Sequence, residues 1–128
     1  MNPPDRKYSK EHEWIKAEGD VSLLGVTYFA QDQLGDVVYI DLPKVGDKIE
    51  QFAKMGEIES VKTVSDLFSP ISGEVVEVNQ GAIDGPEVVN EDPYEKGWLL
   101  KVKIGDSSQL DNLLTADGYE TFLKQTTG

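Results

Sequence analysis

The chain has no cysteine and only one histidine among its 128 residues. Without cysteine there is no disulfide, no thiolate nucleophile and no metal site with thiolate ligands. The single histidine, His12, lies between two glutamates near the N-terminus. An isolated histidine in that setting is more typical of a surface or packing residue than of a catalytic base. Any thiol or disulfide chemistry must therefore be brought by another group.

Common catalytic and binding motifs are also missing. The sequence contains neither Gly-x-Gly-x-x-Gly nor the Walker phosphate loop, and it has no His-Glu-x-x-His zinc motif. Carboxylates are so abundant that their pairing carries no information about catalysis. We predict no catalytic residues and no metal ligands, and hence a protein that is not an enzyme.

Basic residues and long apolar runs are scarce. The longest mostly apolar run, residues 21–30, is too short to cross a bilayer, and the first residues lack the apolar stretch of a secretory signal. Acidic residues number 24 against 12 basic ones, a formal net charge of -12. Such a surface is repelled by nucleic acid and by anionic lipid. We expect protein or small-molecule partners and a location in the bacterial cytoplasm, or in an organelle after processing.

Apolar residues make up 38% of the chain, and they include two Trp, five Tyr and four Phe. This is too much hydrophobic material for a disordered chain. The length suits one hydrophobic core and not two. We therefore expect a single folded domain over residues 1–128.

Most of the sequence consists of short β-prone runs that are separated by Gly, Pro and Asp. Strands are predicted at residues 13–16, 21–26, 37–42, 48–50, 56–61, 66–69, 73–78 and 98–104. Helices are predicted at residues 29–34 and 107–124, the second broken or kinked at Gly118. Residues 79–97 are expected to form a long surface loop. The fold class is mainly β, with helices at its margins.

One lysine lies where two of these strands meet in a hairpin. The turn places Lys62 at an exposed tip, with its amine in solvent on a rigid scaffold. An enzyme that attaches a carboxylic-acid cofactor to one lysine needs such a tight turn, with small neighbours and a fixed surrounding sequence. Glu59, Ser60, Val61 and Thr63 supply these features. On these residues alone, an ordinary exposed lysine in a hairpin remains the alternative.

Ordered segments along almost the whole chain resemble the H proteins of the glycine cleavage system, a family of lipoyl carriers. They are Tyr8-Ser-Lys-Glu-His-Glu-Trp, Ala30-Gln-Asp-Gln-Leu-Gly-Asp-Val-Val-Tyr, Leu42-Pro-Lys-Val-Gly, Glu59-Ser-Val-Lys, Ser69-Pro-Ile-Ser-Gly-Glu-Val-Val-Glu-Val-Asn, Pro86-Glu-Val-Val-Asn-Glu-Asp-Pro-Tyr and Gly97-Trp-Leu-Leu-Lys. Glu-Ser-Val-Lys alone is a moderate signal, whereas the ordered set is strong.

The resemblance implies a barrel-sandwich hybrid with short flanking helices and a C-terminal helix. It implies that lipoate forms an amide with Lys62. It also implies that Glu13 and Asp66 hold the loaded arm in a cleft. In the same way, the segment Glu59, Ser60, Val61 is expected to be recognised by the attaching enzyme.

The partners implied by the resemblance are the other components of glycine cleavage. A pyridoxal-phosphate glycine decarboxylase loads the arm with an aminomethyl group, and a tetrahydrofolate aminomethyltransferase receives it. Dihydrolipoamide dehydrogenase, a flavoenzyme, takes the electrons, and a lipoate ligase or lipoyl transferase attaches the cofactor. The carrier itself is expected to be a monomer.

The sequence departs from the family pattern at two positions, and three competing interpretations stay open. Tyr28 follows Thr27 where the family usually has an acidic or polar residue, and Phe52 replaces a usual turn glycine, so that turn is expected to differ. A biotin carrier favours Met on both sides of its lysine, whereas Val61 and Thr63 flank this one. An H-like lipoyl carrier for lipoate relay or sulfur metabolism is the second interpretation, and an unmodified structural module is the third.

Overall fold

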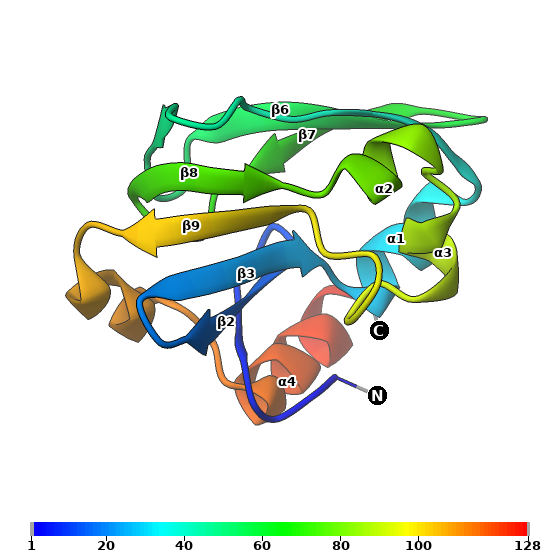
Figure 1. The fold of residues 1–128 in the computed structure, drawn as a ribbon. Coiled ribbons are helices and arrows are strands. Elements are labelled where there is room, and N and C mark those ends of the chain that lie inside the picture. The colour runs from blue at the N-terminus through cyan, green and yellow to red at the C-terminus, as the bar shows by residue number, and fades with distance from the viewer. Residues whose placement is uncertain (1, 128) are drawn as a thin grey trace.

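The computed structural model, which describes residues 2–127, has two antiparallel β-sheets that face each other (Figure 1). The larger sheet has the strand order β1-β2-β3-β9-β8-β5, and the smaller has the order β4-β6-β7. The strands are β1 (Lys7–Tyr8), β2 (Glu13–Glu18), β3 (Val21–Val26), β4 (Val37–Asp41), β5 (Lys48–Ile49), β6 (Lys54–Ser60), β7 (Val64–Phe68), β8 (Gly73–Val78) and β9 (Leu100–Ile104). The mainly β prediction is confirmed.

Helices lie at the ends of this sandwich and below it (Figure 1). They are α1 (Tyr28–Leu34), α2 (Gln80–Asp84), α3 (Val88–Glu91), the 3-10 helix η1 (Ser107–Asn112) and α4 (Ala116–Thr127). Within residues 2–127, no helix combines the length and the apolar character needed to cross a membrane.

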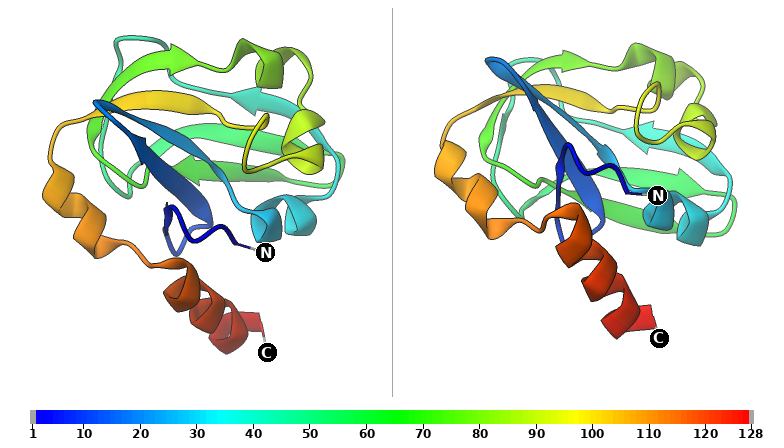
Figure 2. Two further views of the ribbon diagram at one scale, coloured as in Figure 1. Left: turned by 60° about the horizontal axis from the view of Figure 1, so that its bottom comes forward. Right: turned by 90° about the horizontal axis from the view of Figure 1, so that it is seen from below.

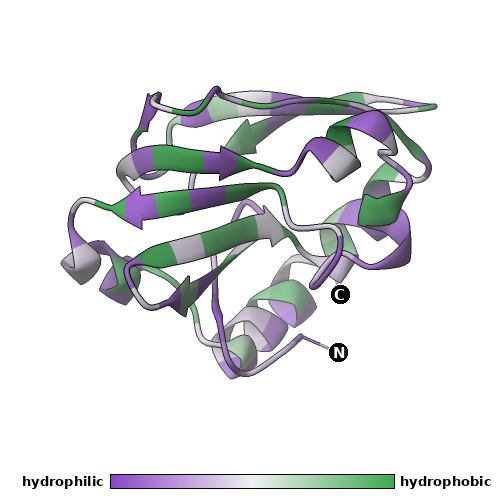
Figure 3. Cartoon of the chain, viewed as in Figure 1, coloured by the Kyte–Doolittle hydropathy of each residue, from purple (hydrophilic) through white to green (hydrophobic). Residues whose placement is uncertain are grey.

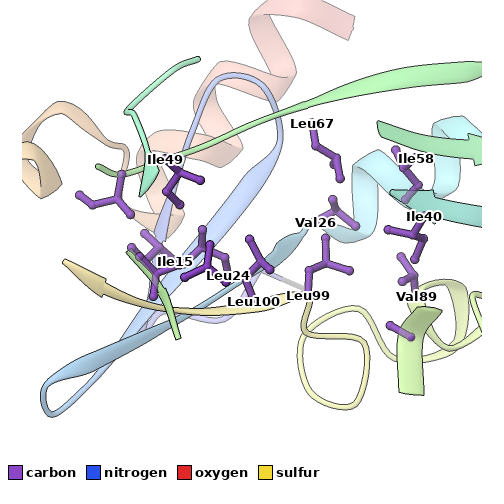
Figure 4. Packing of buried hydrophobic residues seen from close by; sticks show 14 of the residues in the cluster. Ile15, Leu24, Val26, Ile40, Ile49, Ile58, Leu67, Val89, Leu99 and Leu100 are labelled. Carbon is purple, nitrogen blue, oxygen red and sulfur yellow. The ribbon is translucent and has the colours of Figure 1, made fainter. Parts of the chain in front are cut away.

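The main core fills the space between the two sheets. Apolar residues alternate with polar ones along several strands (Figure 3), so that these strands can turn apolar side chains inward. Leu24 and Leu100 of the larger sheet and Ile58 and Leu67 of the smaller sheet are all at most 2% exposed. Figure 4 shows these side chains pointing into one shared interior. This burial is the main source of stability for a sandwich of short strands.

A second, aromatic cluster lies outside the sandwich, where α4 packs beside the N-terminal segment (Figure 2). Tyr8, Trp14 and Tyr119 are fully buried there, and the rings of Tyr8 and Tyr119 stack at 4.9 Å between centroids. Trp14 is paired with Gly25 across β2 and β3, where a Cβ on Gly25 would lie 2.5 Å from the Trp14 ring. A glycine is therefore required under this tryptophan.

The strand predictions for residues 21–26 and 73–78 have the observed bounds, and the others overlap the observed strands. The two-residue strand β1 was not predicted because it is too short to show a period. The turn between β2 and β3 consists of Gly19 and Asp20, with Gly19 at a φ of 67°. Tight hairpin turns need such a positive φ, which is why the Gly-Asp signal located this turn correctly.

The prediction of a single helix over residues 107–124 with its break at Gly118 is wrong. Helix η1 and helix α4 are separated by residues 113–115, and Gly118 lies inside α4. The break has a clear cause: Leu114 exchanges two backbone hydrogen bonds with Tyr8, at 2.8 and 2.7 Å. An extended residue that pairs with a strand leaves the helical conformation.

The prediction of a surface loop over residues 79–97 is also wrong in part. This segment contains α2 and α3, which bury Ala82 and Val89 completely in the main core. The Asn79 side chain donates to the carbonyl oxygens of Lys96 and Trp98, and so ties the two ends of the segment together. The segment is a packed cap on one end of the sandwich.

Candidate functional site

The predicted lysine hairpin is formed by β6 and β7. Ser60 N–H donates to Thr63 O at 2.8 Å, which leaves Val61 and Lys62 at the tip. Both tip residues are exposed, Val61 at 70%. Inside the turn, the buried Ser60 Oγ accepts hydrogen bonds from the backbone N–H groups of Lys62 and Thr63, at 3.3 and 3.2 Å. The backbone of Lys62 is therefore held firmly, while the residue itself remains exposed.

The end of α1 supports the hairpin from the side. Val61 N–H donates to the carbonyl oxygen of Asp36 at 3.0 Å. Gly35, which ends the helix at a φ of 80°, lies under the lysine: a Cβ there would be 3.3 Å from Lys62 Cε. Sequence reasoning identified Gly35 as a helix end but not as the residue that leaves room for the lysine side chain.

Glu13, at the start of β2, is a buried carboxyl that is 2% exposed. Ser9 Oγ donates to its Oε1 at 2.7 Å, and Phe68 N–H donates to its Oε2 at 3.3 Å. Burial disfavours the charged form and raises the pKa of Glu13 to about 8, against the smaller opposing effect of these hydrogen bonds. Glu13 is therefore a carboxyl that can take up or release a proton near neutral pH.

Asp66, on β7, is about half exposed and forms an ion pair with Lys54 at 3.1 Å. The same Lys54 amine pairs with Glu57 at 2.9 Å, and Glu57 lies directly opposite Asp66 across the hairpin. The Lys54 amine thus forms ion pairs with two carboxylates and neutralises their negative charge only partly. The remaining negative charge would attract an additional cation to Asp66.

Glu13 and Asp66 line the same cleft, which has a volume of about 250 Å³. Thr63, the neighbour of Lys62, lines it as well. Its apolar wall is formed by Val26, Phe29, Leu34, Ile58 and Leu67. A largely apolar cleft with a few polar groups suits a slender chain with a polar end, and the volume is just below that of drug-sized sites, about 300 Å³ and above. The structure therefore brings the two predicted docking residues together beside the lysine hairpin.

The three residues predicted for recognition by the attaching enzyme differ in exposure. Glu59 and Val61 are exposed near the tip, whereas Ser60 is 4% exposed. Ser60 can therefore contribute through the shape of the turn, while Glu59 and Val61 are accessible for direct contact.

His12 also lines the cleft, which sequence reasoning did not anticipate. Its Nδ1 lies 2.7 Å from the hydroxyl of Tyr119 on α4, and its ring packs against Phe29. The backbone φ of His12 is 71°, a left-handed conformation that histidine adopts more readily than most residues. The lone position of this histidine in the sequence carried no signal of these contacts.

Comparison with known proteins identifies the family. The sequence model of the Glycine cleavage H-protein family matches residues 6–126. This chain belongs to that family. The glycine cleavage system H protein of Symbiobacterium thermophilum is 54% identical over 123 residues, which cover 96% of each chain. That of Staphylococcus carnosus is 54% identical over 121 residues, 94% of this chain and 96% of its relative.

Solved structures agree with this assignment. The crystal structure of a glycine cleavage system H protein from Mycobacterium marinum has a TM-score of 0.84 and 40% identity, and the match covers 99% of this chain and 100% of that one. The expected barrel-sandwich hybrid of the H-protein family is thereby confirmed. Phe52, at the position where the resemblance led us to expect a turn glycine, has a left-handed φ of 68°. Glycine adopts such a φ more readily than a residue with a side chain.

Proposed function

We propose that this chain is the lipoyl carrier of a glycine cleavage system, with lipoate held in amide linkage on Lys62. The observation that carries this proposal is the placement of Lys62 at an exposed hairpin tip, next to Thr63, which lines a cleft with the carboxyls of Glu11, Glu13 and Asp66. The role in glycine cleavage rests on membership of the H-protein family. The carrier is proposed to have no catalytic residues of its own.

When bound, the lipoyl group supplies a dithiolane that carries an aminomethyl group and electrons. We assign the loading step to a pyridoxal-phosphate glycine decarboxylase and the receiving step to a tetrahydrofolate aminomethyltransferase. Dihydrolipoamide dehydrogenase is the proposed electron acceptor, and a lipoate ligase or lipoyl transferase the attaching enzyme. We further propose a monomer of one domain in the bacterial cytoplasm.

The chemistry of the cleft fits a cationic arm. An aminomethyl group at neutral pH bears a positive charge, and three carboxyl residues, Glu11, Glu13 and Asp66, line the cleft together with Thr63. Because the pKa of Glu13 is about 8, this carboxyl is mostly protonated in the empty cleft near neutral pH. A cation at hydrogen-bond distance would favour the ionised form. Docking is therefore expected to release a proton from Glu13.

Attachment can be tested by intact mass after incubation with a lipoate ligase, lipoate and ATP. The wild type should gain the mass of one lipoyl group, and Lys62→Arg should gain none. Lys48→Arg is a matched control, because Lys48 has a side chain that is 78% exposed and lies away from the hairpin, on β5. A wild type that stays unmodified, or a modified Lys62→Arg variant, would overturn the assignment.

The glycine-specific role has its own test. Incubation of the lipoylated protein with glycine and a glycine decarboxylase should add the aminomethyl group to the arm. A carrier that serves lipoate relay or sulfur metabolism would be lipoylated but would not accept this group. The same mass measurement therefore separates the two kinds of lipoyl carrier.

Docking can be tested by the lifetime of the loaded form in buffer. Glu13→Gln combined with Asp66→Asn should shorten it several-fold, because the amine loses both carboxylates that hold it in the cleft. Glu50→Gln and Asp41→Asn, two exposed changes of the same chemistry, serve as the matched control. An unchanged decay rate in the double variant at Glu13 and Asp66 would remove the docking role.

A further inference from the structure

The one histidine of the chain has no role in the proposal so far, yet its ring is fixed on several sides. Phe29 of α1 and Phe122 of α4 contact the His12 ring, at centroid distances of 4.7 and 6.0 Å. Its Nδ1 lies 2.7 Å from the Tyr119 hydroxyl. Two helices from opposite ends of the sequence thus position this imidazole at the wall of the cleft.

The hydroxyl of Tyr119 makes a second hydrogen bond, to Thr27 Oγ1 at 2.8 Å. Thr27 caps α1, since its Oγ1 also accepts from the backbone N–H of Ala30 at 3.2 Å. Thr27 and Tyr119 are both fully buried. His12, Tyr119 and Thr27 therefore form a short chain of hydrogen bonds that is closed to water at its Thr27 end.

The number of hydrogens available shows which group donates in each of these hydrogen bonds. If Tyr119 donated to Thr27, the Thr27 hydroxyl hydrogen would have no acceptor, because within residues 2–127 this oxygen has hydrogen bonds only with the Tyr119 hydroxyl and the Ala30 N–H. A buried donor without an acceptor is costly. In the opposite direction every hydrogen is used: Thr27 donates to Tyr119, and Tyr119 donates to His12 Nδ1. Nδ1 must then be an acceptor without a hydrogen.

The hydrogen of the neutral His12 ring therefore lies on Nε2. In the described part of the chain, Nε2 has no hydrogen-bond partner, and no buried side-chain nitrogen or oxygen is left unpaired there. Nε2 is consequently open to solvent, and the cleft is the cavity that His12 lines together with Glu13 and Asp66. His12 thus carries a solvent-accessible N–H donor and is one of the residues that line the cleft.

The charge of His12 matters for the same cleft. Burial lowers the pKa of His12, and the neighbouring Glu11 opposes this shift weakly. Further ionisable groups on this side of the molecule are Glu13 and Asp66 of the cleft, Tyr119, and Lys10, whose amine lies over the Phe122 ring. A neutral ring keeps positive charge away from the place where a cationic arm would dock.

We propose that Tyr119 fixes His12 as the neutral tautomer with its hydrogen on Nε2, and that this N–H donates a hydrogen bond to a sulfur of the arm docked beside Glu13. His12 is then a binding residue for the sulfur end of the arm, and Tyr119 is a positioning residue that acts through it. The hydrogen bond to the arm rests on the proposed lipoyl function. The tautomer of His12 concerns the protein alone.

The tautomer can be measured by nitrogen NMR, and a single histidine makes the assignment unambiguous. In the unlipoylated wild type at pH 7.5, we expect a protonated Nε2 and an unprotonated Nδ1. Tyr119→Phe should give an averaged pattern of both tautomers. Tyr8→Phe is the matched control: it loses a buried hydroxyl of the same cluster, one that bonds to Pro3 O and not to His12. A hydrogen on Nδ1 in the wild type would overturn the proposal.

The contact with the arm has a separate readout. Loading of the lipoylated wild type should shift the Nε2 resonance. Tyr119→Phe should shorten the lifetime of the loaded form about twofold, because only the fraction of molecules with the hydrogen on Nε2 can make the contact. Tyr8→Phe should match the wild type in lifetime, and thermal unfolding would confirm that both variants fold. An unshifted Nε2 resonance, or equal lifetimes for Tyr119→Phe and the wild type, would refute the contact.

The experiments distinguish an absent His12 contact from a wrong assignment of function. A wild type whose loaded arm decays as fast as the loaded free cofactor would refute docking as a whole, and the His12 contact with it. A wild type that never accepts lipoate would refute the attachment to Lys62. A protected wild type with an equally protected Tyr119→Phe variant would refute only the role of Tyr119 and His12.

Discussion

Phe52 carries backbone strain that a glycine would not. Its φ of 68° lies in the left-handed region, which costs a residue with a Cβ about 1–2 kcal/mol. The turn holds this conformation through the Phe52 N–H, which donates to Ser69 O at 2.6 Å. Half of the side chain is exposed, so its packing offsets only part of this cost.

Replacement of Phe52 by glycine and by alanine separates the backbone effect from the loss of the ring. Both variants lose the ring, but only glycine relieves the strain. After allowance for the greater freedom of glycine in the unfolded chain, Phe52→Gly should be more stable than Phe52→Ala by roughly 0.5–1 kcal/mol. Urea unfolding measures this difference. An alanine variant as stable as the glycine variant would show that the turn is not strained.

At the scale of elements, local sequence signals found most strands but missed contacts between distant segments. Residues 21–26 and 73–78 are short β-prone runs next to clear turn residues, and both were predicted with the observed bounds. The break before α4 could not be predicted, because its cause is the pairing of Leu114 with Tyr8, more than 100 residues away in the sequence. The burial of Val89 likewise depends on the space that the sheets leave for α3.

The same limit applies to the candidate site. Lys62 could be predicted from the hairpin pattern and the family resemblance, since both the turn and its neighbours are local in sequence. Glu13 and Asp66 could be named only from the resemblance, because β2 and β7 belong to different sheets and meet only in the folded molecule. The hydrogen-bond chain from Thr27 through Tyr119 to His12 spans three distant segments and had no sequence signal.

For the whole molecule, the response of stability to pH depends on the groups whose pKa differs between the folded and the unfolded chain, and not on the excess of acidic residues as such. Glu13 is such a group, because burial raises its pKa in the folded state. Among the carboxyls, it should dominate the pH dependence of unfolding between weakly acidic and weakly basic conditions.

The sign of this dependence follows from the two pKa values of Glu13, 4.5 as the ordinary value and about 8 in the folded protein. Between them the unfolded chain has lost the proton that the folded chain keeps, so the contribution of Glu13 to the free energy of unfolding should fall by at most roughly 1.4 kcal/mol per pH unit and level off above pH 8. Glu13→Gln lacks this effect and should gain stability relative to the wild type as the pH rises. Urea unfolding at pH 5, 6.5 and 8.5 measures the difference, with Glu50→Gln as the exposed control. A constant offset between Glu13→Gln and the wild type across this range would mean that Glu13 is already ionised in the folded protein at pH 5.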